Sequence, residues 1–231
     1  MPAVDLVAAA AGRRGDRDDM TGSVDLRVLQ LVCSRLCHDL AGPVGAVNNG
    51  IELIAELGEA DPEAMALIGE SAKETARRLQ YHRVALGFSS GAANSRREIH
   101  GLAANYFGNG KIALDWSPGE SEAAVALTDG QAKLLLNLLL LAAEALPRGG
   151  AIGVHWPASS EGSNFVVTAR GDGARVTAEM STAFDATTSV DDLTARSVQG
   201  YFTARLAESL SATLMLDDSR PGEVALSARV A

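Results

Sequence analysis

The sequence predicts a protein of two parts, a long helical hairpin followed by an α/β sandwich of two layers. Large apolar side chains recur at steps of three and four from Leu29 to Ile54, which is the period of one helix face. Beyond Ser95, short apolar runs alternate with helical stretches, the order that gives helices packed on a mixed sheet. Hydrophobic residues make up 47% of the 231 residues, enough to form the core of such a fold.

The first helix is expected to begin near Ser23 or Asp25, because either side chain can cap its first turn, and to end near Leu57. Pro43 lacks a backbone donor and predicts a kink part-way along this helix. The preceding residues 1–22 are rich in Ala, Gly, Asp and Arg without a sustained period, so we expect a disordered leader.

The second helix is expected to run from residue 63 to about residue 88, with Asp61 as its cap and Pro62 in its first turn. Together the helices predict an antiparallel hairpin over residues 23–88. A hairpin with two apolar stripes cannot cover itself, so two copies are expected to pair as a four-helix bundle in a homodimer. The side chains assigned to the paired stripe are Leu29, Leu36, Leu40, Val47, Ile51, Met65, Ile68 and Leu79.

The small polar segment 89–95 predicts a linker, and residues 96–231 predict the α/β domain. The helices expected in this domain are 97–107, 129–146, 176–184 and 191–210. The expected strands are 111–116, 124–127, 151–156, 164–170, 213–216 and 223–230.

Composition excludes several classes of function. The formal net charge is −9 and the basic residues are scattered, so we expect no nucleic-acid partner. No apolar run reaches the length of about 18 residues that crosses a bilayer, and we expect a cytoplasmic protein with no membrane partner. Cys33 and Cys37 lie one helical turn apart without convergent ligands. They are expected to be buried or half-buried apolar side chains rather than a metal site or a disulfide.

One histidine stands apart from the apolar stripe of the first helix. His38 is two residues from both Leu36 and Leu40, so its side chain is expected to point away from the stripe and face water. An imidazole is largely unprotonated near neutral pH and can attack phosphorus. The neighbouring carboxylate of Asp39 can orient the ring or act as a base. The alternative interpretation is a solvated surface histidine beside a charge.

The run from His38 to Val44 resembles the phospho-acceptor motif of sensor histidine kinases, in which a histidine and an acid are followed by leucine and, three residues later, proline. The second half is similar to the ATP-binding domain of the same kinases. Residues 134–150 correspond to the helix that carries the magnesium-binding asparagine, but Leu141 stands at that position. Asn137 is expected to be a helix-surface or interface polar residue.

Two further ATP-handling motifs depart from the kinase pattern. Ala169 stands where an aspartate contacts adenine, although Gly171 and Gly173 are kept, and residues 197–200 lack the paired glycines that approach phosphate. A leucine cannot coordinate magnesium and an alanine cannot pair with adenine, so no ATP use is expected. Alternatively, residues 171–173 are only a strand-to-helix loop.

The combined layout resembles the histidine phosphotransferase family that serves cell-cycle phosphorelays in alphaproteobacteria. The resemblance implies that His38 carries the phosphoryl group and that Asp39 orients the His38 ring. It implies a phosphorylated receiver domain of a hybrid histidine kinase as donor, and response regulators as acceptors. The chain is expected to have no cofactor of its own, because the receiver supplies magnesium. Arg35, Gly42 and Gly45 are expected to form the floor for the docking receiver, although Arg35 can also be interpreted as a solvated charge.

Two alternatives stand beside this interpretation. A working histidine kinase is disfavoured by Leu141 and Ala169, since the lost ligand contacts would remove more affinity than one substitution restores. A dimeric adaptor or regulator that docks receivers without accepting phosphate is favoured by the degenerate domain. It is disfavoured by the acid and proline context of His38.

Overall fold

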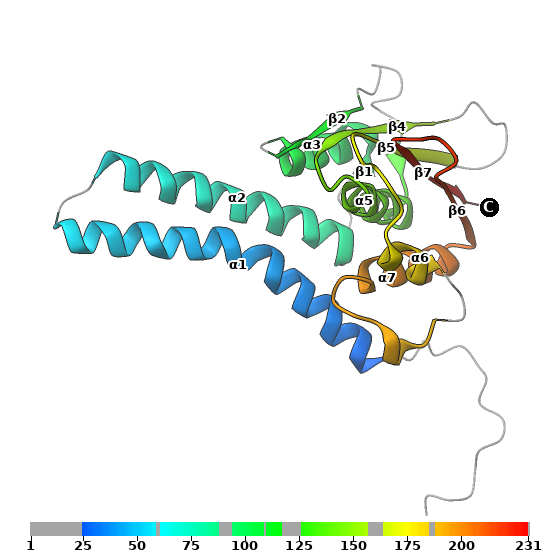
Figure 1. Cartoon of the computed structure of the whole chain (residues 1–231), viewed down its shortest axis with the longest axis horizontal. Coiled ribbons are helices and arrows are strands. Elements are labelled where there is room, and N and C mark those ends of the chain that lie inside the picture. The colour runs from blue at the N-terminus through cyan, green and yellow to red at the C-terminus, as the bar shows by residue number, and fades with distance from the viewer. Residues whose placement is uncertain are drawn as a thin grey trace, which may run out of the picture.

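The computed structural model describes residues 25–58, 61–87, 94–108, 110–116, 126–156, 164–184 and 188–230. The chain folds into two side-by-side helices, α1 and α2, whose connected end projects away from a compact α/β part (Figure 1). The expected leader, residues 1–22, lies outside the described residues. The fold class predicted from the sequence, a helical hairpin followed by an α/β sandwich, is confirmed.

Helix α1 (Leu26–Leu57) has capping groups at both ends. The Asp25 side chain accepts a hydrogen bond from the backbone N–H of Arg27, as expected for one of the two candidate caps. Gly58 ends the helix with a φ of 74°, a left-handed conformation that glycine adopts without strain. Pro43 lies inside the helix, and α1 changes direction part-way along its length in Figure 1.

Helix α2 (Pro62–Leu86) begins after Asp61, whose side chain accepts a hydrogen bond from the backbone N–H of Ala64. Met65 and Leu79, which the sequence assigns to the stripe paired between two copies, are exposed in the single chain. The side chains that α2 buries within the chain are Ala64, Ser71, Tyr81, His82 and Ala85. The hairpin and the α/β part therefore bury one face of α2 and leave part of its apolar face uncovered.

The α/β part contains a mixed five-stranded sheet in the order β2-β4-β5-β7-β6, where β2 and β4 are parallel and the other pairs are antiparallel. Its strands are β2 (Ile112–Asp115), β4 (Gly150–His155), β5 (Asn164–Arg170), β6 (Ala212–Asp217) and β7 (Glu223–Val230). Its helices are α3 (Arg96–Phe107), α5 (Asp129–Glu144), α6 (Ala178–Phe184) and α7 (Val198–Ser209). A short antiparallel pair joins β1 (Asn94–Ser95) to β3 (Ala126–Leu127).

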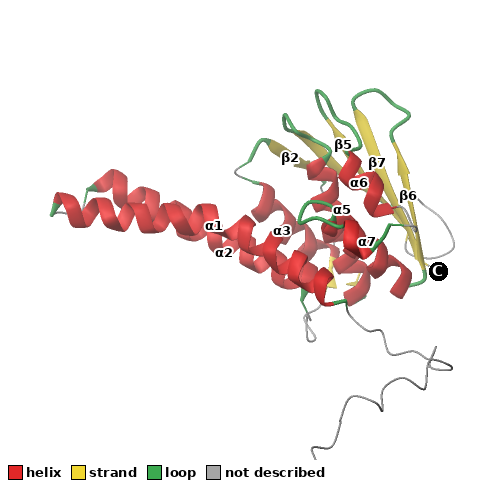
Figure 2. Cartoon of the chain, turned by 60° about the horizontal axis from the view of Figure 1, so that its bottom comes forward, coloured by secondary structure: helices red, strands yellow, loops and turns green. Residues whose placement is uncertain are grey.

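Helix α5 lies at the centre of the molecule. It is buried along most of its length because it contacts the sheet as well as α2 and α7, and this accounts for its almost continuous leucine run. Along β5 and β7 buried residues alternate with less buried ones, so one face of the sheet packs on the helices. Figure 2 shows the helices on one side of the sheet, which is the two-layer arrangement expected from the sequence.

Two segments differ from the expected element boundaries. The helix expected over 191–210 is a 3₁₀ turn, η1 (Val190–Asp192), followed by the shorter α7. Thr194 and Ser197 interrupt it, because each side-chain oxygen accepts a hydrogen bond from the backbone N–H of the other residue, at 3.2 and 2.9 Å. In the expected linker, Asn94 and Ser95 form β1, and residues 89–93 lie outside the described part of the chain.

Buried hydrogen bonds attach α2 to the α/β part. The Tyr81 hydroxyl donates to the carbonyl of Leu136 at 2.8 Å. The Asn137 amide donates to the carbonyl of Ala85 at 2.7 Å and accepts from Gln199 at 2.6 Å. The hairpin is therefore fixed to α5 and α7 in one orientation. Among the described residues, no helix is long and apolar enough to cross a membrane.

Candidate functional site

His38 lies on the first half of α1, and its side chain is 89% exposed. This is the outward orientation that its spacing from Leu36 and Leu40 predicts. Its Nδ1 atom lies 3.6 Å from Oδ1 of Asp39. An exposed imidazole whose Nδ1 faces a carboxylate presents its other nitrogen, Nε2, to an approaching partner.

Asp39 connects the exposed histidine to the interior of the hairpin. Its side chain is 23% exposed, and its Oδ2 lies 3.6 Å from Nε2 of His82 on α2. Its backbone carbonyl accepts a hydrogen bond from Nη1 of Arg78 at 2.7 Å. Arg78 is itself held by Glu74, at 2.7 Å. The acid next to His38 is therefore bonded to the facing helix through its main chain, and its side chain lies beside His82 on that helix.

His82 and Tyr106 line the interior side of this arrangement. Burial lowers the pKa of His82; the Asp39 charge opposes this shift, and Arg35 and Arg78 reinforce it. Burial, with a contribution from the Asp39 charge, raises the pKa of Tyr106 to about 12. Both groups therefore favour their neutral forms at neutral pH, and Asp39 lies beside them.

A pocket of about 590 Å³ opens beside His38, between α1 and the α/β part. His38 and Asp39 form one wall, and Glu144, Thr177 and Arg196 contribute from the opposite side. Its polar lining combines acids and bases from two parts of the fold. A group that binds in this pocket and reaches His38 therefore also contacts the α/β part.

Arg35, one helical turn before Asp39, forms an ion pair with Glu144 at the end of α5 and donates to the carbonyl of Arg196 at 3.2 Å. Its side chain is 20% exposed. The alternative in which Arg35 is a solvated charge is therefore wrong, because its guanidinium lies between the two parts of the protein. Burial raises the pKa of Glu144, although pairing with Arg35 opposes the shift.

Gly42 and Gly45 lie beyond His38 on α1. A Cβ atom added at either position would meet no atom within 4 Å among the described residues, so neither glycine is required by packing within the chain. Gly42 is exposed and Gly45 is half-buried. Both positions leave room beside α1 beyond the histidine.

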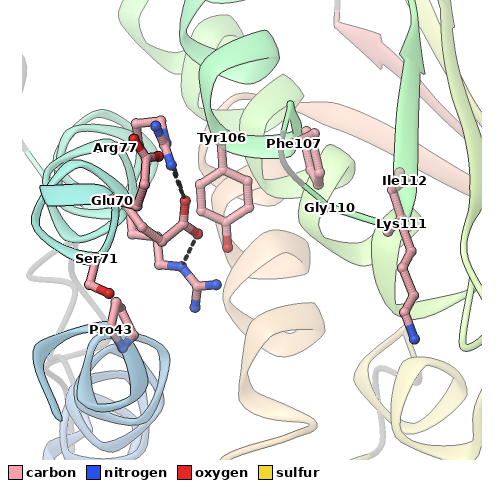
Figure 3. A pocket seen from close by; sticks show the side chains of 11 residues that line it. Pro43, Glu70, Ser71, Arg77, Tyr106, Phe107, Gly110, Lys111 and Ile112 are labelled. Atoms are coloured by element: carbon pink, nitrogen blue, oxygen red, sulfur yellow. Dashed lines mark hydrogen bonds and ion pairs between the residues drawn. The ribbon is translucent and has the colours of Figure 1, made fainter. Parts of the chain in front are cut away.

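A second pocket, of about 380 Å³, lies between the hairpin and α3 (Figure 3). Glu74 forms ion pairs with Arg77 and Arg78 at its edge, marked by the dashed lines, and the Tyr106 ring projects into it from α3. Two of its basic groups share the single carboxylate of Glu74. Arg78 links this pocket to the site, because it also holds the Asp39 carbonyl.

The positions that depart from the ATP-binding pattern lie inside the core. Leu141 and Ala169 are both 0% exposed. Asn137 is also 0% exposed and bonded to Ala85, Lys133 and Gln199. The expectation of a helix-surface position for Asn137 is therefore wrong, and the interface alternative describes it: it joins α5 to α2 and α7.

The local backbone accounts for the glycines at positions 171 and 173. A Cβ atom on Gly171 would lie 2.5 Å from the carbonyl oxygen of Gly149, and Gly173 has a φ of 72°. The exposed Asp172 forms an ion pair with Arg148 at 2.7 Å. These contacts favour the alternative in which the segment is a strand-to-helix loop.

The prediction that Cys33 and Cys37 are buried or half-buried is wrong. Both side chains are exposed, because they lie on a side of α1 that neither α2 nor the α/β part covers. Among the described residues, no group of three or more His, Cys, Asp or Glu side chains is arranged to hold a metal ion.

Sequence reasoning missed His82, Glu144 and Arg78. A signal for His82 exists, because Asp39 and His82 are almost equally far from the hairpin turn and residues at equal distances face each other in an antiparallel pair. Glu144 carries no such signal, since its contact with Arg35 joins residues 109 positions apart.

Comparison with known proteins identifies the family. Residues 96–221 match the model described as the histidine phosphotransferase C-terminal domain. Over 180 residues the chain is 41% identical to Protein phosphotransferase ChpT of Brucella abortus (strain 2308), covering 77% of this chain and 84% of that protein. The chain belongs to the histidine phosphotransferase family.

The fold of this histidine phosphotransferase is also similar to a solved bacterial phosphotransferase, with a TM-score of 0.75 and 35% identity. That similarity covers 90% of this chain and 98% of the solved one, so it includes both the hairpin and the sandwich. The chain is thus a phosphotransferase of a phosphorelay, as its sequence predicts.

Proposed function

We propose that this histidine phosphotransferase relays a phosphoryl group between the aspartates of receiver domains, with His38 as the intermediate carrier. The observation that carries the proposal is the placement of His38, which is 89% exposed, faces an acid and borders the pocket between α1 and the α/β part. The donor is a phosphorylated receiver of a hybrid histidine kinase, and the acceptors are response regulators in a cell-cycle relay, as the family resemblance implies.

The transfer needs little covalent machinery from this chain. The lone pair of His38 Nε2 forms the bond to phosphorus while the bond from phosphorus to the receiver carboxylate breaks, and that carboxylate keeps the electron pair. The proton on Nδ1 stays on the ring, and the Asp39 carboxylate balances the positive charge that the ring acquires. In this proposal the receiver brings the magnesium ion. Transfer to the next receiver reverses these bond changes, so the chain contributes positioning rather than chemical activation.

The α/β part serves in this proposal as a docking surface rather than an ATP site. Leu141 and Ala169 are buried apolar side chains, and neither can coordinate magnesium or pair with adenine. The amide of Gln199 is bonded to Asn137 and not directed to a ligand. We expect calorimetric titration with magnesium-ATP to give no saturable heat; heat in the micromolar range would contradict this part of the proposal.

A homodimer built on a four-helix bundle completes the proposal. Its support is the set of large apolar side chains that a single hairpin leaves about half exposed. These are Leu29, Val44, Ile51, Leu53, Leu57, Met65, Leu67 and Leu79. The His38 ring points outward in each copy, so pairing leaves both histidines available to receivers.

Incubation with a phosphorylated receiver tests the function. We expect acid-labile, base-stable phosphate on the wild-type protein and none on His38→Gln, with wild-type labelling of His155→Gln, a variant of another exposed histidine. Labelling of His38→Gln at the wild-type rate would remove His38 from the reaction. Receiver binding without labelling of the wild-type protein would instead favour a non-catalytic adaptor.

A further inference from the structure

Asp39 lies between two imidazoles of opposite character. His38 on one side is 89% exposed, whereas the side chain of His82 on the other is 3% exposed. One carboxylate oxygen faces each ring, at 3.6 Å in both cases. These separations are slightly longer than a hydrogen bond, and they place the carboxylate next to both rings at once.

His82 is buried without an ordinary hydrogen-bond partner. Among the described residues, neither of its ring nitrogens has one. A neutral imidazole always carries one N–H, and a buried donor without an acceptor is costly. The rings of Tyr81 and Tyr106 stand edge-on to His82, with centroids 6.1 and 5.9 Å away. The acceptor that faces the Nε2 atom is the carboxylate of Asp39.

The charges around His82 also support the Asp39 carboxylate as the acceptor for its Nε2–H. Asp39 and Arg35 act on it from α1, and Arg78 from α2, while Tyr106 of α3 is neutral. Burial and the two arginines all disfavour a charged His82, so its pKa is lowered. A neutral His82 can donate from Nε2 to Asp39 without neutralising the carboxylate.

We propose that His82 is a positioning residue for phosphotransfer, which holds the Asp39 carboxylate so that its other oxygen accepts the Nδ1 proton of His38. This inference rests on the proposed function, and it adds a residue on the second helix to the catalytic arrangement. With the proton kept on Nδ1, the lone pair of His38 resides on Nε2, the nitrogen that faces solvent. Arg78 contributes by fixing the Asp39 backbone at 2.7 Å.

Two substitutions of His82 distinguish the role of its N–H donor from the role of the size of its ring. His82→Gln can place an amide N–H close to the position of Nε2, whereas His82→Phe keeps an aromatic ring without a donor. We expect His82→Phe to slow phosphate acceptance from a phosphorylated receiver about tenfold or more, because a misplaced reacting group loses orientation. His82→Gln is expected to recover most of the rate.

The tautomer of His38 provides a readout that does not depend on phosphotransfer. In ¹H–¹⁵N spectra of the unphosphorylated protein, we expect His38 to favour the Nδ1–H tautomer in the wild type and in His82→Gln. This preference should weaken in His82→Phe and in Asp39→Asn. Adding His82→Phe to Asp39→Asn should change neither the tautomer nor the rate further, since both act through one contact.

Each result bears on the inference separately from the proposed function. An unchanged tautomer and transfer rate in His82→Phe would overturn the positioning role, even if His38→Gln abolishes labelling. Equal losses in His82→Gln and His82→Phe, with the His38 tautomer unchanged, would also overturn it and leave a packing role. Conversely, a tautomer that depends on His82 in a protein that accepts no phosphate would refute the proposed function and not the contact.

Discussion

Arg35 and Glu144 form an ion pair that joins the helix carrying His38 to the end of α5 in the α/β part. The side chains are 20% and 24% exposed, so the pair is mostly shielded from water. The pair bridges the pocket that His38 borders. It fixes the orientation of the α/β part beside the histidine, and this link is open to test.

Replacing Arg35 by Met is expected to lower the free energy of unfolding by about 1–3 kcal/mol, because Glu144 keeps a partly buried charge without its partner. Urea denaturation measures this change. The double variant Arg35→Met, Glu144→Leu should be less destabilised than Arg35→Met alone. As a control, Arg205→Met breaks the more exposed pair with Glu208 and should cost less than about 0.5 kcal/mol. A loss as large as that of Arg35→Met would contradict this account.

The stability of the protein should fall as the pH is lowered through 6.5, the ordinary pKa of histidine, because burial lowers the pKa of His82. Below that pH the unfolded chain binds a proton at His82 that the folded chain does not, so acid favours unfolding. The slope from this group is at most about 1.4 kcal/mol per pH unit. Urea unfolding between pH 8 and pH 5, compared with His82→Gln, isolates the contribution. Parallel curves for the two proteins would show that His82 does not titrate on unfolding.

The buried amide of Asn137 is expected to stabilise the junction of α2, α5 and α7. Asn137→Ala removes its bonds to Ala85 and Gln199 and leaves both partners buried, which should cost about 3 kcal/mol. Thermal or urea unfolding measures the loss. The matched control is Asn48→Ala, whose exposed side chain bonds only to Glu52 among the described residues and should matter by less than about 0.5 kcal/mol. Equal effects of the two variants would refute a special role for Asn137.

Charged substitutions on the hairpin should dissociate the proposed dimer. Ile51 and Leu79 are 54% and 53% exposed, so Ile51→Glu or Leu79→Glu leaves the fold of one chain intact but places a carboxylate in the apolar seam. Light scattering should show a monomer for either variant. Met215→Glu, at a position 66% exposed on β6, should leave the mass unchanged. A dimer that persists in both hairpin variants would place the interface elsewhere.

Local signals were sufficient to predict most of the fold. The period from Leu29 onward and a cap at Ser23 or Asp25 locate α1, and the helix expected over 129–146 corresponds to α5. The prediction over residues 191–210 is wrong at its start, because Thr194 and Ser197 bond each other's backbone and compete with the helix. Apolar periodicity alone does not report such bonds.

The candidate site was predictable only in part. The exposed position of His38 and the neighbouring Asp39 follow from one helix, and the sequence indicates both. The partners from other elements do not follow in this way. His82 meets Asp39 only when the hairpin closes, and Arg35 meets Glu144 only when the α/β part is in place, so local patterns carry little information about either contact.

The start of α1 is also bound to a late part of the chain. The Arg27 guanidinium donates to the backbone carbonyls of Val190, Asp191 and Leu193, at 3.0, 2.9 and 3.1 Å, across 163 to 166 residues of sequence. During synthesis on the ribosome, the two hairpin helices emerge and can pair long before these carbonyls exist. We therefore expect attachment of the first turn of α1 to be among the last steps of folding.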